Sequence, residues 1–408
     1  MAKARPADAG TVTSPKGFLA AGVQCGLKAS GKKDLALLVS ETPCAAAGVF
    51  TSNQVRAAPV RVCQEHLRRR GRAIRAVVVN AGVANACTGE PGLANARAMT
   101  EVVGRALELE PSAVLVASTG VIGPQLPMEK VTAGIWLAVQ QLSPRGGPDA
   151  GQAIMTTDSR AKHGSVQVTV GGKRVTIGGI CKGAGMIAPN MATMLCFLTS
   201  DVAATPAVLK QALKAAVARS FNSITVDGDQ STNDTVLVLA NGQAGNRPLA
   251  EAKGADYARF LEGLTQLAQQ LAREIVRDGE GATKVMAITV RDARTEAEAK
   301  RVGLSIANSN LVKCAMFGND PNWGRIAAAV GYAPVKVRPE KLSLWLGPLR
   351  VVHQGTPAAF DQQAAHELLK QSETIEVTVS LGLGKAEWTV WGSDLTYDYV
   401  RINAEYRT

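Results

Sequence analysis

The segment 182–201, near the middle of the chain, places the strongest constraint on the fold because it joins an irregular loop to a strand. Gly183 and Gly185 permit backbone conformations with positive φ, and Pro189 blocks a helix. The apolar run 194–198 that follows has the length and composition of a short buried strand. We therefore expect a loop that enters a buried strand near residue 193.

Residues 183–188 also match the Gly-x-Gly-x-x-Ala form of the dinucleotide-binding fingerprint. That fingerprint requires a strand before it and a helix that opens at its last glycines. Pro189 and the strand after it exclude such a helix, so we reject a nucleotide-binding turn at this place.

The bond between Ala192 and Thr193 lies in this loop and joins the residue types of a self-cleaving peptide bond. The Thr193 hydroxyl can attack the Ala192 carbonyl to give an ester, and hydrolysis of the ester leaves Thr193 with a free α-amino group. That amine, with a reference pKa of about 7.7–8.0, can act as general base for the hydroxyl of the same residue. The alternative is a threonine that only packs in a strand.

Segment 182–201 resembles the signature of the ornithine acetyltransferase family, self-processing enzymes of arginine biosynthesis with an N-terminal threonine. Further segments resemble blocks of the same family: 80–89, 118–123, 226–234 and 317–325. The resemblance extends from about residue 10 to the last residue, so it covers nearly the whole chain.

The resemblance implies an α/β (α+β) fold of layered sheets flanked by helices, of a type shared with the DmpA aminopeptidases. It implies a catalytic domain of residues 1–284 and a smaller α/β domain of residues 285–408, whose tail returns to the active site. Cleavage would give an α chain of residues 1–192 and a β chain that starts at residue 193. Two copies of each chain would form a heterotetramer.

Thr119 and Gly120 follow the predicted strand 113–118 and are expected in a loop, 118–123. A hydroxyl next to a backbone N–H that no side chain shields is suited to an oxyanion hole. The alternative is an ordinary glycine turn after a strand. The family resemblance assigns the oxyanion hole to these two residues.

The resemblance also implies a set of substrate contacts, which fall on Thr156, Lys182, Thr193, Glu280, Asn403 and Thr408. Lys182 and Glu280 offer opposite charges to the carboxylate and ammonium ends of an amino-acid substrate, and the sequence does not assign an end to either. Segment 80–89 is either a turn over a helix start or a wall of the active site.

The implied activity is acetyl transfer from N2-acetyl-L-ornithine to L-glutamate through acetyl-Thr193, by a ping-pong mechanism. It gives L-ornithine and N-acetyl-L-glutamate in the cyclic arginine pathway. The enzyme would need no cofactor and no metal, and some family members also use acetyl-CoA as a donor. The alternative is an N-terminal-nucleophile amidohydrolase or aminopeptidase of related fold, in which water takes the acyl group.

Composition argues against several other classes of protein. The chain has 408 residues, 46% of them hydrophobic, yet its apolar runs are too short for a signal sequence or a bilayer span. We expect a cytoplasmic enzyme with small-molecule substrates and no membrane partner. The net charge of +11 and the basic run 68–72 raise nucleic acid as a partner, but aromatic residues are missing there and a solvated helix end explains the run better.

Metal sites are not indicated by the sequence. The seven cysteines show no C-x-x-C spacing, and a calcium loop beginning at Asp227 would need a glycine where Thr232 stands and a glutamate where Val238 stands. Cys181 and Cys196 lie close to the proposed cleavage site, where a reactive thiol is conceivable, but buried packing is the expected role.

Periodicity predicts most of the remaining elements. Strands are expected at 34–40, 45–50, 74–80, 235–240 and 285–290, helices at 60–67, 92–109, 206–220, 257–276 and 296–308, and a hairpin around Gly171 and Gly172. Asp320 and Pro321 are expected to cap and begin a helix. The alternation in 400–407 predicts a half-buried C-terminal strand that packs against the body of the protein.

Overall fold

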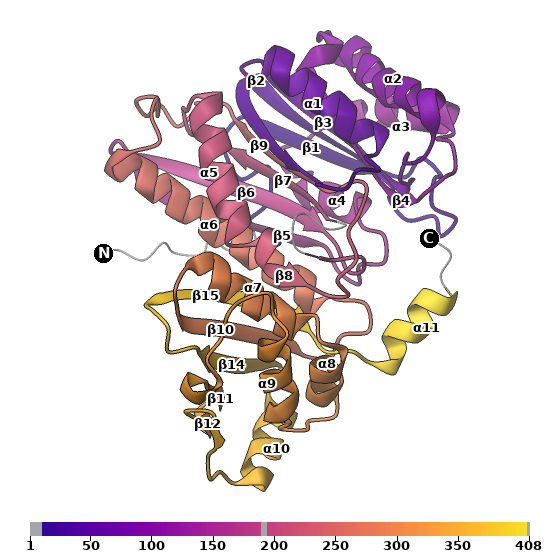
Figure 1. The fold of residues 1–408 in the computed structure, drawn as a ribbon. Helices are drawn as coiled ribbons and strands as arrows, with labels where there is room; N and C mark the ends of the chain where they lie inside the picture. The colour runs from indigo at the N-terminus through magenta and orange to yellow at the C-terminus, as the bar shows by residue number, and fades with distance from the viewer. Residues whose placement is uncertain (1–9, 189–193, 406–408) are drawn as a thin grey trace.

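Two β-sheets, each covered by helices, make up the computed structural model, which describes residues 10–188 and 194–405 (Figure 1). The layered α/β fold class expected from the sequence is confirmed. None of the helices within the described ranges is long and apolar enough to cross a bilayer.

The first sheet has eight strands and carries the predicted cleavage loop. Its strands are β1 (Phe18–Val23), β2 (Leu35–Phe50), β3 (Ile74–Val83), β4 (Val114–Val121), β5 (Lys162–Val170), β6 (Lys173–Lys182), β7 (Leu195–Ser200) and β9 (Thr235–Ala240). They follow the order β4-β3-β2-β9-β7-β6-β5, and β1 pairs with β2. The hairpin of β5 and β6 ends at Lys182, as predicted, and β7 pairs antiparallel with β6.

The expectation of two separate strands at 34–40 and 45–50 is wrong, because β2 is one continuous strand of 16 residues. Its first part pairs with β1 and β3, and its second part, from Ala45, pairs with β9. The pairing with β3 shifts register between Val39 and Cys44. Pro43 falls within this shift, where a missing N–H does not interrupt a regular ladder.

Two hydrophobic clusters pack against the first sheet. One cluster includes residues of α1 (Ala58–Arg70), α2 (Gly89–Leu107), α3 (Met128–Gln140) and α4 (Gly147–Ala153). The other includes residues of α5 (Pro206–Ala218) and α6 (Gly254–Arg277). The side chain of Thr205 caps α5 by accepting a hydrogen bond from the Val208 N–H, and α1 ends with three arginines in its last turn.

The second sheet comes mainly from the last third of the chain. Its strands are β8 (Ile224–Thr225), β10 (Val285–Ala293), β11 (Ser343–Leu346), β12 (Leu349–His353), β13 (Thr356–Pro357), β14 (Thr374–Ser380) and β15 (Ala386–Ser393). Helices α7 (Glu296–Ala307), α8 (Asn310–Phe317), α9 (Trp323–Gly331) and α10 (Gln362–Gln371) accompany it. Strand β8 belongs to the region 1–284 but pairs with β15 at the edge of this sheet, so it ties the two layers together.

The prediction that Asp320 caps a helix beginning at Pro321 is wrong by two residues. Helix α9 begins at Trp323, and the side chain of Asn322 caps it by accepting a hydrogen bond from the Arg325 N–H at 3.3 Å. Asn319 has a positive φ of 55°, so the chain is still turning before Pro321 and enters the helix only after it.

The predicted C-terminal strand is also wrong, because residues Tyr397–Glu405 form helix α11. Tyr397 is 84% exposed and Val400 is 63% exposed, so the helix is not packed down as expected. An ion pair between Asp398 and Arg401, three residues apart, has helical spacing. The alternation of apolar and polar residues does not report burial here, because in the helix Tyr397 and Val400 face solvent while Tyr399 and Ile402 are half-buried.

Candidate active site

A cavity of about 120 Å³ lies at the ends of β4 and β6, beside the entrance to β7. It brings together six residues that the sequence analysis selected, from five separate segments of the chain. Its lining consists of Ala84, Thr119, Gly120, Ile122, Thr156, Thr157, Lys182, Gly185, Met186, Ser231, Thr232, Asn233, Glu280 and Asn403. Of the predicted site residues, Ala192, Thr193 and Thr408 lie outside the described residues.

Thr119 and Gly120 lie near the end of β4, where they still pair with β3, rather than in a loop after the strand as expected. Thr119 is buried, and Gly120 has a φ of +129°, a conformation that favours glycine. Gly120 pairs with Gly82 of the parallel strand β3. The strand pairing therefore fixes the direction of the Gly120 backbone at the cavity.

Lys182 is the last residue of β6 and is buried at the cavity wall. Burial lowers the pKa of its ammonium group, and the neighbouring carboxylate of Asp158 opposes that shift. A lysine that keeps its charge in such a place offers a strong, poorly solvated positive charge to an anionic group in the cavity.

Glu280 reaches the cavity from the loop after α6 and is held by its neighbours. Its backbone N–H donates to the Ala184 carbonyl at 3.0 Å, and the Asn403 Nδ2 of α11 donates to its Oε2 at 2.9 Å. A Cβ on Gly185 would lie 2.3 Å from Oε2, so only glycine lets the carboxylate approach the loop this closely. The site thus places a carboxylate and an ammonium group on one small cavity.

Segment 226–234 cross-links the loops around the cavity. The Asp227 carboxylate accepts hydrogen bonds from the N–H groups of Met186 at 2.6 Å and Ile187 at 2.8 Å. The Asn233 Nδ2 donates to the carbonyls of Ala84 at 2.6 Å and Ser118 at 2.8 Å. These bonds connect the cleavage loop to β3 and β4.

Segment 80–89 leads into a helix, and one of its residues lines the candidate cavity. Ala84 lines the cavity, and Gly89 begins α2. Asn233 and Asp158 were not selected from the sequence as site residues. Asn233 contacts Ala84 and Ser118, which are distant in the sequence, and Asp158 contacts Gly183 beyond the β5–β6 hairpin, so the local spacing of neither residue indicates its role.

Neither nearby cysteine is a reactive thiol. Cys181 and Cys196 are buried, and desolvation raises the pKa of both thiols. Their role in packing is therefore confirmed. Within the described ranges, no group of three or more His, Cys, Asp or Glu side chains has the arrangement of a metal site.

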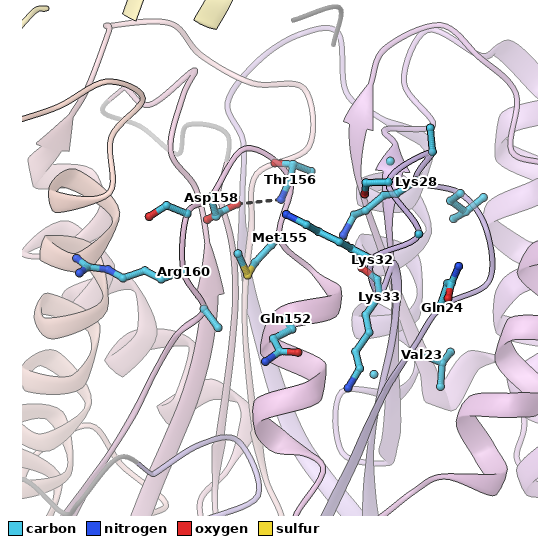
Figure 2. A pocket seen from close by; sticks show the side chains of 18 of the residues that line it. Val23, Gln24, Lys28, Lys32, Lys33, Gln152, Met155, Thr156, Asp158 and Arg160 are labelled. Atoms are coloured by element: carbon cyan, nitrogen blue, oxygen red, sulfur yellow. Dashed lines mark hydrogen bonds between the residues drawn. The ribbon is translucent and has the colours of Figure 1, made fainter. Parts of the chain in front are cut away.

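A larger cavity of about 1220 Å³ adjoins the first and shares Thr156 with it. Figure 2 shows Lys28, Lys32 and Lys33 on one side of this cavity and Arg160 on the other. Two of these cations have acidic partners, because Lys33 pairs with Asp149 and Arg160 with Glu274. Lys28 and Lys32 add further positive charge to the lining of this larger cavity.

Comparisons with known proteins agree with this geometry. The family model described as the ArgJ family matches residues 19–408. An arginine biosynthesis bifunctional protein ArgJ from Symbiobacterium thermophilum is 51% identical over 98% of this chain and 99% of its own, and one from Gloeobacter violaceus is 48% identical over 98% of each.

A solved structure of an arginine biosynthesis bifunctional protein from Bacillus halodurans is also similar. It matches 52% of this chain and 98% of its own chain, with 42% identity and a TM-score of 0.50. Because a single family model and full-length relatives cover nearly every described residue, the chain belongs to the ArgJ family, the family that the motif at 182–201 predicts.

Proposed function

We propose that this enzyme transfers an acetyl group from N2-acetyl-L-ornithine to L-glutamate through an acetyl ester on Thr193. The observation that carries the proposal is the convergence of Thr119, Gly120, Lys182 and Glu280 on one cavity. Family membership supports the same reaction, because the full-length relatives are named as bifunctional enzymes of arginine biosynthesis.

In the first half-reaction, the neutral α-amine of Thr193 takes the proton of the hydroxyl as the oxygen attacks the acetyl carbonyl. The tetrahedral oxyanion accepts hydrogen bonds from the Thr119 hydroxyl and the Gly120 N–H. The C–N bond then breaks, the α-ammonium returns its proton to the departing nitrogen, and ornithine leaves. The acetyl group remains on Thr193 as an ester.

In the second half-reaction, the amine of glutamate attacks the ester carbonyl and forms the new C–N bond. Its surplus proton passes through the α-amine of Thr193 to the departing Thr193 oxygen, which restores the hydroxyl. Lys182 and Glu280 supply one positive and one negative charge for the charged ends of the two amino acids. The small volume of the cavity favours substrates of this size.

We propose also that the chain cleaves itself between Ala192 and Thr193. Strand β7 lies between β6, which precedes the bond, and β9, which follows it. The two products would therefore share one sheet and remain associated. The Bacillus halodurans chain corresponds to about half of this chain, which supports two-chain products in the family.

We propose the domain division near residue 284, an assembly of two α and two β chains, and a cytoplasmic location with substrates rather than nucleic acid or membranes as partners. All strands of the second sheet except β8 come from residues 285–408, which supports the division.

We propose acetyl-CoA as a second acetyl donor. It would act as a substrate, and the enzyme would need no bound cofactor. The larger cavity beside Thr156 has the room and the positive charge that a phosphate-bearing donor requires. A Lys32→Gln variant should raise the KM for acetyl-CoA and leave the KM for N2-acetylornithine unchanged.

The test is a steady-state assay of the purified protein with N2-acetylornithine, in the presence and absence of glutamate. Transfer predicts that ornithine release depends on glutamate and equals the N-acetylglutamate formed. Release of ornithine and free acetate at the same rate without glutamate would support the hydrolase instead. If the protein turns over neither N2-acetylornithine nor acetyl-CoA, the proposed function is refuted.

A further inference from the structure

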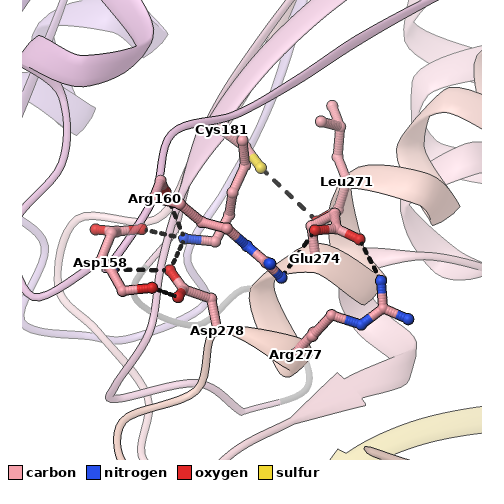
Figure 3. Close-up of polar contacts among 9 residues, drawn as sticks. Asp158, Arg160, Cys181, Leu271, Glu274, Arg277 and Asp278 are labelled. Atoms are coloured by element: carbon pink, nitrogen blue, oxygen red, sulfur yellow. Dashed lines mark hydrogen bonds and ion pairs between the residues drawn. The ribbon is translucent and has the colours of Figure 1, made fainter. Parts of the chain in front are cut away.

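A buried ion network lies behind the wall of the small cavity. The Lys162 ammonium donates to Asp158 Oδ1 at 2.6 Å and to Asp278 Oδ2 at 2.5 Å, and all three side chains are shielded from solvent. Figure 3 shows Asp158 and Asp278 close together, with the ion pair of Arg160 and Glu274 beside them. The network joins β5, the loop before it and the end of α6.

The Asp158 carboxylate holds two segments that line the cavity. Its Oδ2 accepts a hydrogen bond from the Thr156 N–H at 3.0 Å, and its Oδ1 accepts one from the Gly183 N–H at 2.7 Å. Thr156 lines the cavity, and Gly183 directly follows Lys182. One carboxylate therefore fixes the spacing between Thr156 and the end of β6.

The Asp278 carboxylate extends the network toward Glu280. It accepts hydrogen bonds from the Ser159 N–H at 3.1 Å and from the Ser159 hydroxyl. Asp278 ends α6 and stands two residues before Glu280. The network thus connects all three segments that carry Thr156, Lys182 and Glu280.

Asp158 also favours the charged form of Lys182. Asp158, Glu280 and Asp234 favour the charged form of Lys182, whereas Lys162 disfavours it, and Lys28 is a further cation close enough to interact. Although burial opposes ionisation, the ammonium groups of Lys182 and Lys162 lower the pKa of Asp158 to about 2. Asp158 therefore remains a carboxylate throughout the neutral range.

Stability alone gives little reason for such a network. Taking charges out of water is costly, and apolar side chains of similar size are often as stable as a buried ion pair. The contacts instead converge on backbone groups next to the cavity. That pattern is the one expected of groups that orient other residues at a site.

We propose that Asp158 is a positioning residue of this enzyme: with Lys162 and Asp278 it aligns Thr156, Lys182 and Glu280, and it keeps Lys182 positively charged for a substrate carboxylate. The proposal rests on the proposed function, because it assumes that these three residues contact the amino-acid substrates. Asp158 itself does not line the small cavity.

The test compares Asp158→Asn with the unmodified protein in two measurements. The first is the KM for glutamate and for N2-acetylornithine; we expect increases of about 10–100-fold, because hydrogen bonds to a charged group are lost. The second is the affinity for N-acetyl-L-glutamate between pH 6 and 10, measured by calorimetry. This probe carries carboxylates and no amine, so its alkaline titration reports protein groups.

The sign of the pH effect follows from the charge of Lys182. Binding of the carboxylate requires the cation, so affinity is present below the pKa of Lys182 and is lost as the pH rises through it. Removing the Asp158 charge lowers that pKa further, so the loss of affinity should move to lower pH in Asp158→Asn. A merely structural role would weaken binding equally at every pH.

Two further variants make the test decisive. Glu274→Gln removes exposed ion pairs one turn earlier on α6 and should leave both measurements unchanged. Asp278→Asn keeps both backbone contacts of Asp158 but removes the charge and one of the two oxygens that accept from Ser159 and Lys162, so KM should rise while the pH of half-maximal affinity stays in place. If Asp158→Asn does not fold, an unchanged KM in Asp278→Asn overturns the proposal.

The outcomes separate this proposal from the proposed function. An unchanged KM and pH profile in folded Asp158→Asn, with normal acetyl transfer by the unmodified protein, refutes only the positioning role. Failure of the unmodified protein to transfer acetyl refutes the function, whereas the N-acetylglutamate titration still tests how Asp158 acts on Lys182.

Discussion

A Cβ atom on Gly120 would lie 2.3 Å from the carbonyl carbon of Gly82 in the neighbouring strand. Strands β3 and β4 therefore approach each other at the cavity through two glycines, with no room for a side chain on Gly120. The position to which we assign the oxyanion-binding N–H is therefore one that only glycine can occupy.

This contact changes what is expected of Gly120→Ala. From the sequence alone, the substitution should harm turnover more than folding. The contact with Gly82 and the φ of +129° predict a loss of stability as well, of about 1–3 kcal/mol, because an alanine is strained in this conformation. The unfolding temperature and kcat should both fall. An unaltered unfolding temperature would contradict the close packing of Gly120 against Gly82.

Thr119→Ala should lower kcat about 10²–10³-fold if the hydroxyl is one of the two oxyanion donors. KM should change little, because the interaction forms mainly in the transition state. Thr119→Ser keeps a hydroxyl at this position and is the matched control, expected to retain most of the activity. Equal kcat values for the alanine variant and the unmodified enzyme would remove Thr119 from the oxyanion hole.

Thr193→Ala should give one uncleaved chain without transferase activity. The unmodified protein should appear in intact mass spectrometry as two chains, 1–192 and 193–408, that separate only under denaturing conditions. Thr193→Ser retains a nucleophile and should still cleave. A full-length species that is fully active would exclude the α-amine of Thr193 as the catalytic base.

Asn403→Ala should raise the KM for the amino-acid substrates by about 3–10-fold, because Glu280 loses the hydrogen bond that α11 donates to it. The unfolding temperature should stay the same, since α11 has no buried residue. A fall in stability without a change in KM would show that the helix supports the fold rather than the site.

Removal of residues 407–408, or a tag fused after Thr408, should cut activity and leave cleavage intact. This prediction comes from the family resemblance, because Thr408 lies outside the described residues. A fully active C-terminally tagged enzyme would remove Thr408 from the substrate-binding residues.

Local patterns in the sequence predict the buried parts of this fold well. The hairpin of β5 and β6 has a two-glycine turn, and α6 has a long apolar face, so their periodicity is set by burial. Helix α11 is the opposite case, since it is exposed and its alternation has no meaning for packing. Strand β2 was divided wrongly because Pro43 marks a change of partner rather than an end.

The site residues could be predicted only in part, because some of them have no local pattern in the sequence. Thr119 and Gly120 carry a local signal, a hydroxyl beside a glycine at a strand end. Glu280 carries none, and the family resemblance alone selected it. Asp158 carries no such signal, because its bond to the Gly183 N–H and its link through Lys162 to Asp278 form only when the chain folds.

The position of β7 between β6 and β9 has a consequence for the proposed cleavage of the chain. A separately synthesised fragment of residues 1–192 would leave the outer edge of β6 and the second half of β2 without strand partners. Unpaired edges of this kind recruit other chains and aggregate. For the proposed cleavage, this pairing predicts that the polypeptide completes its central sheet as one precursor before the bond is cut, and that co-expression of the two halves is a poor substitute for the intact gene product.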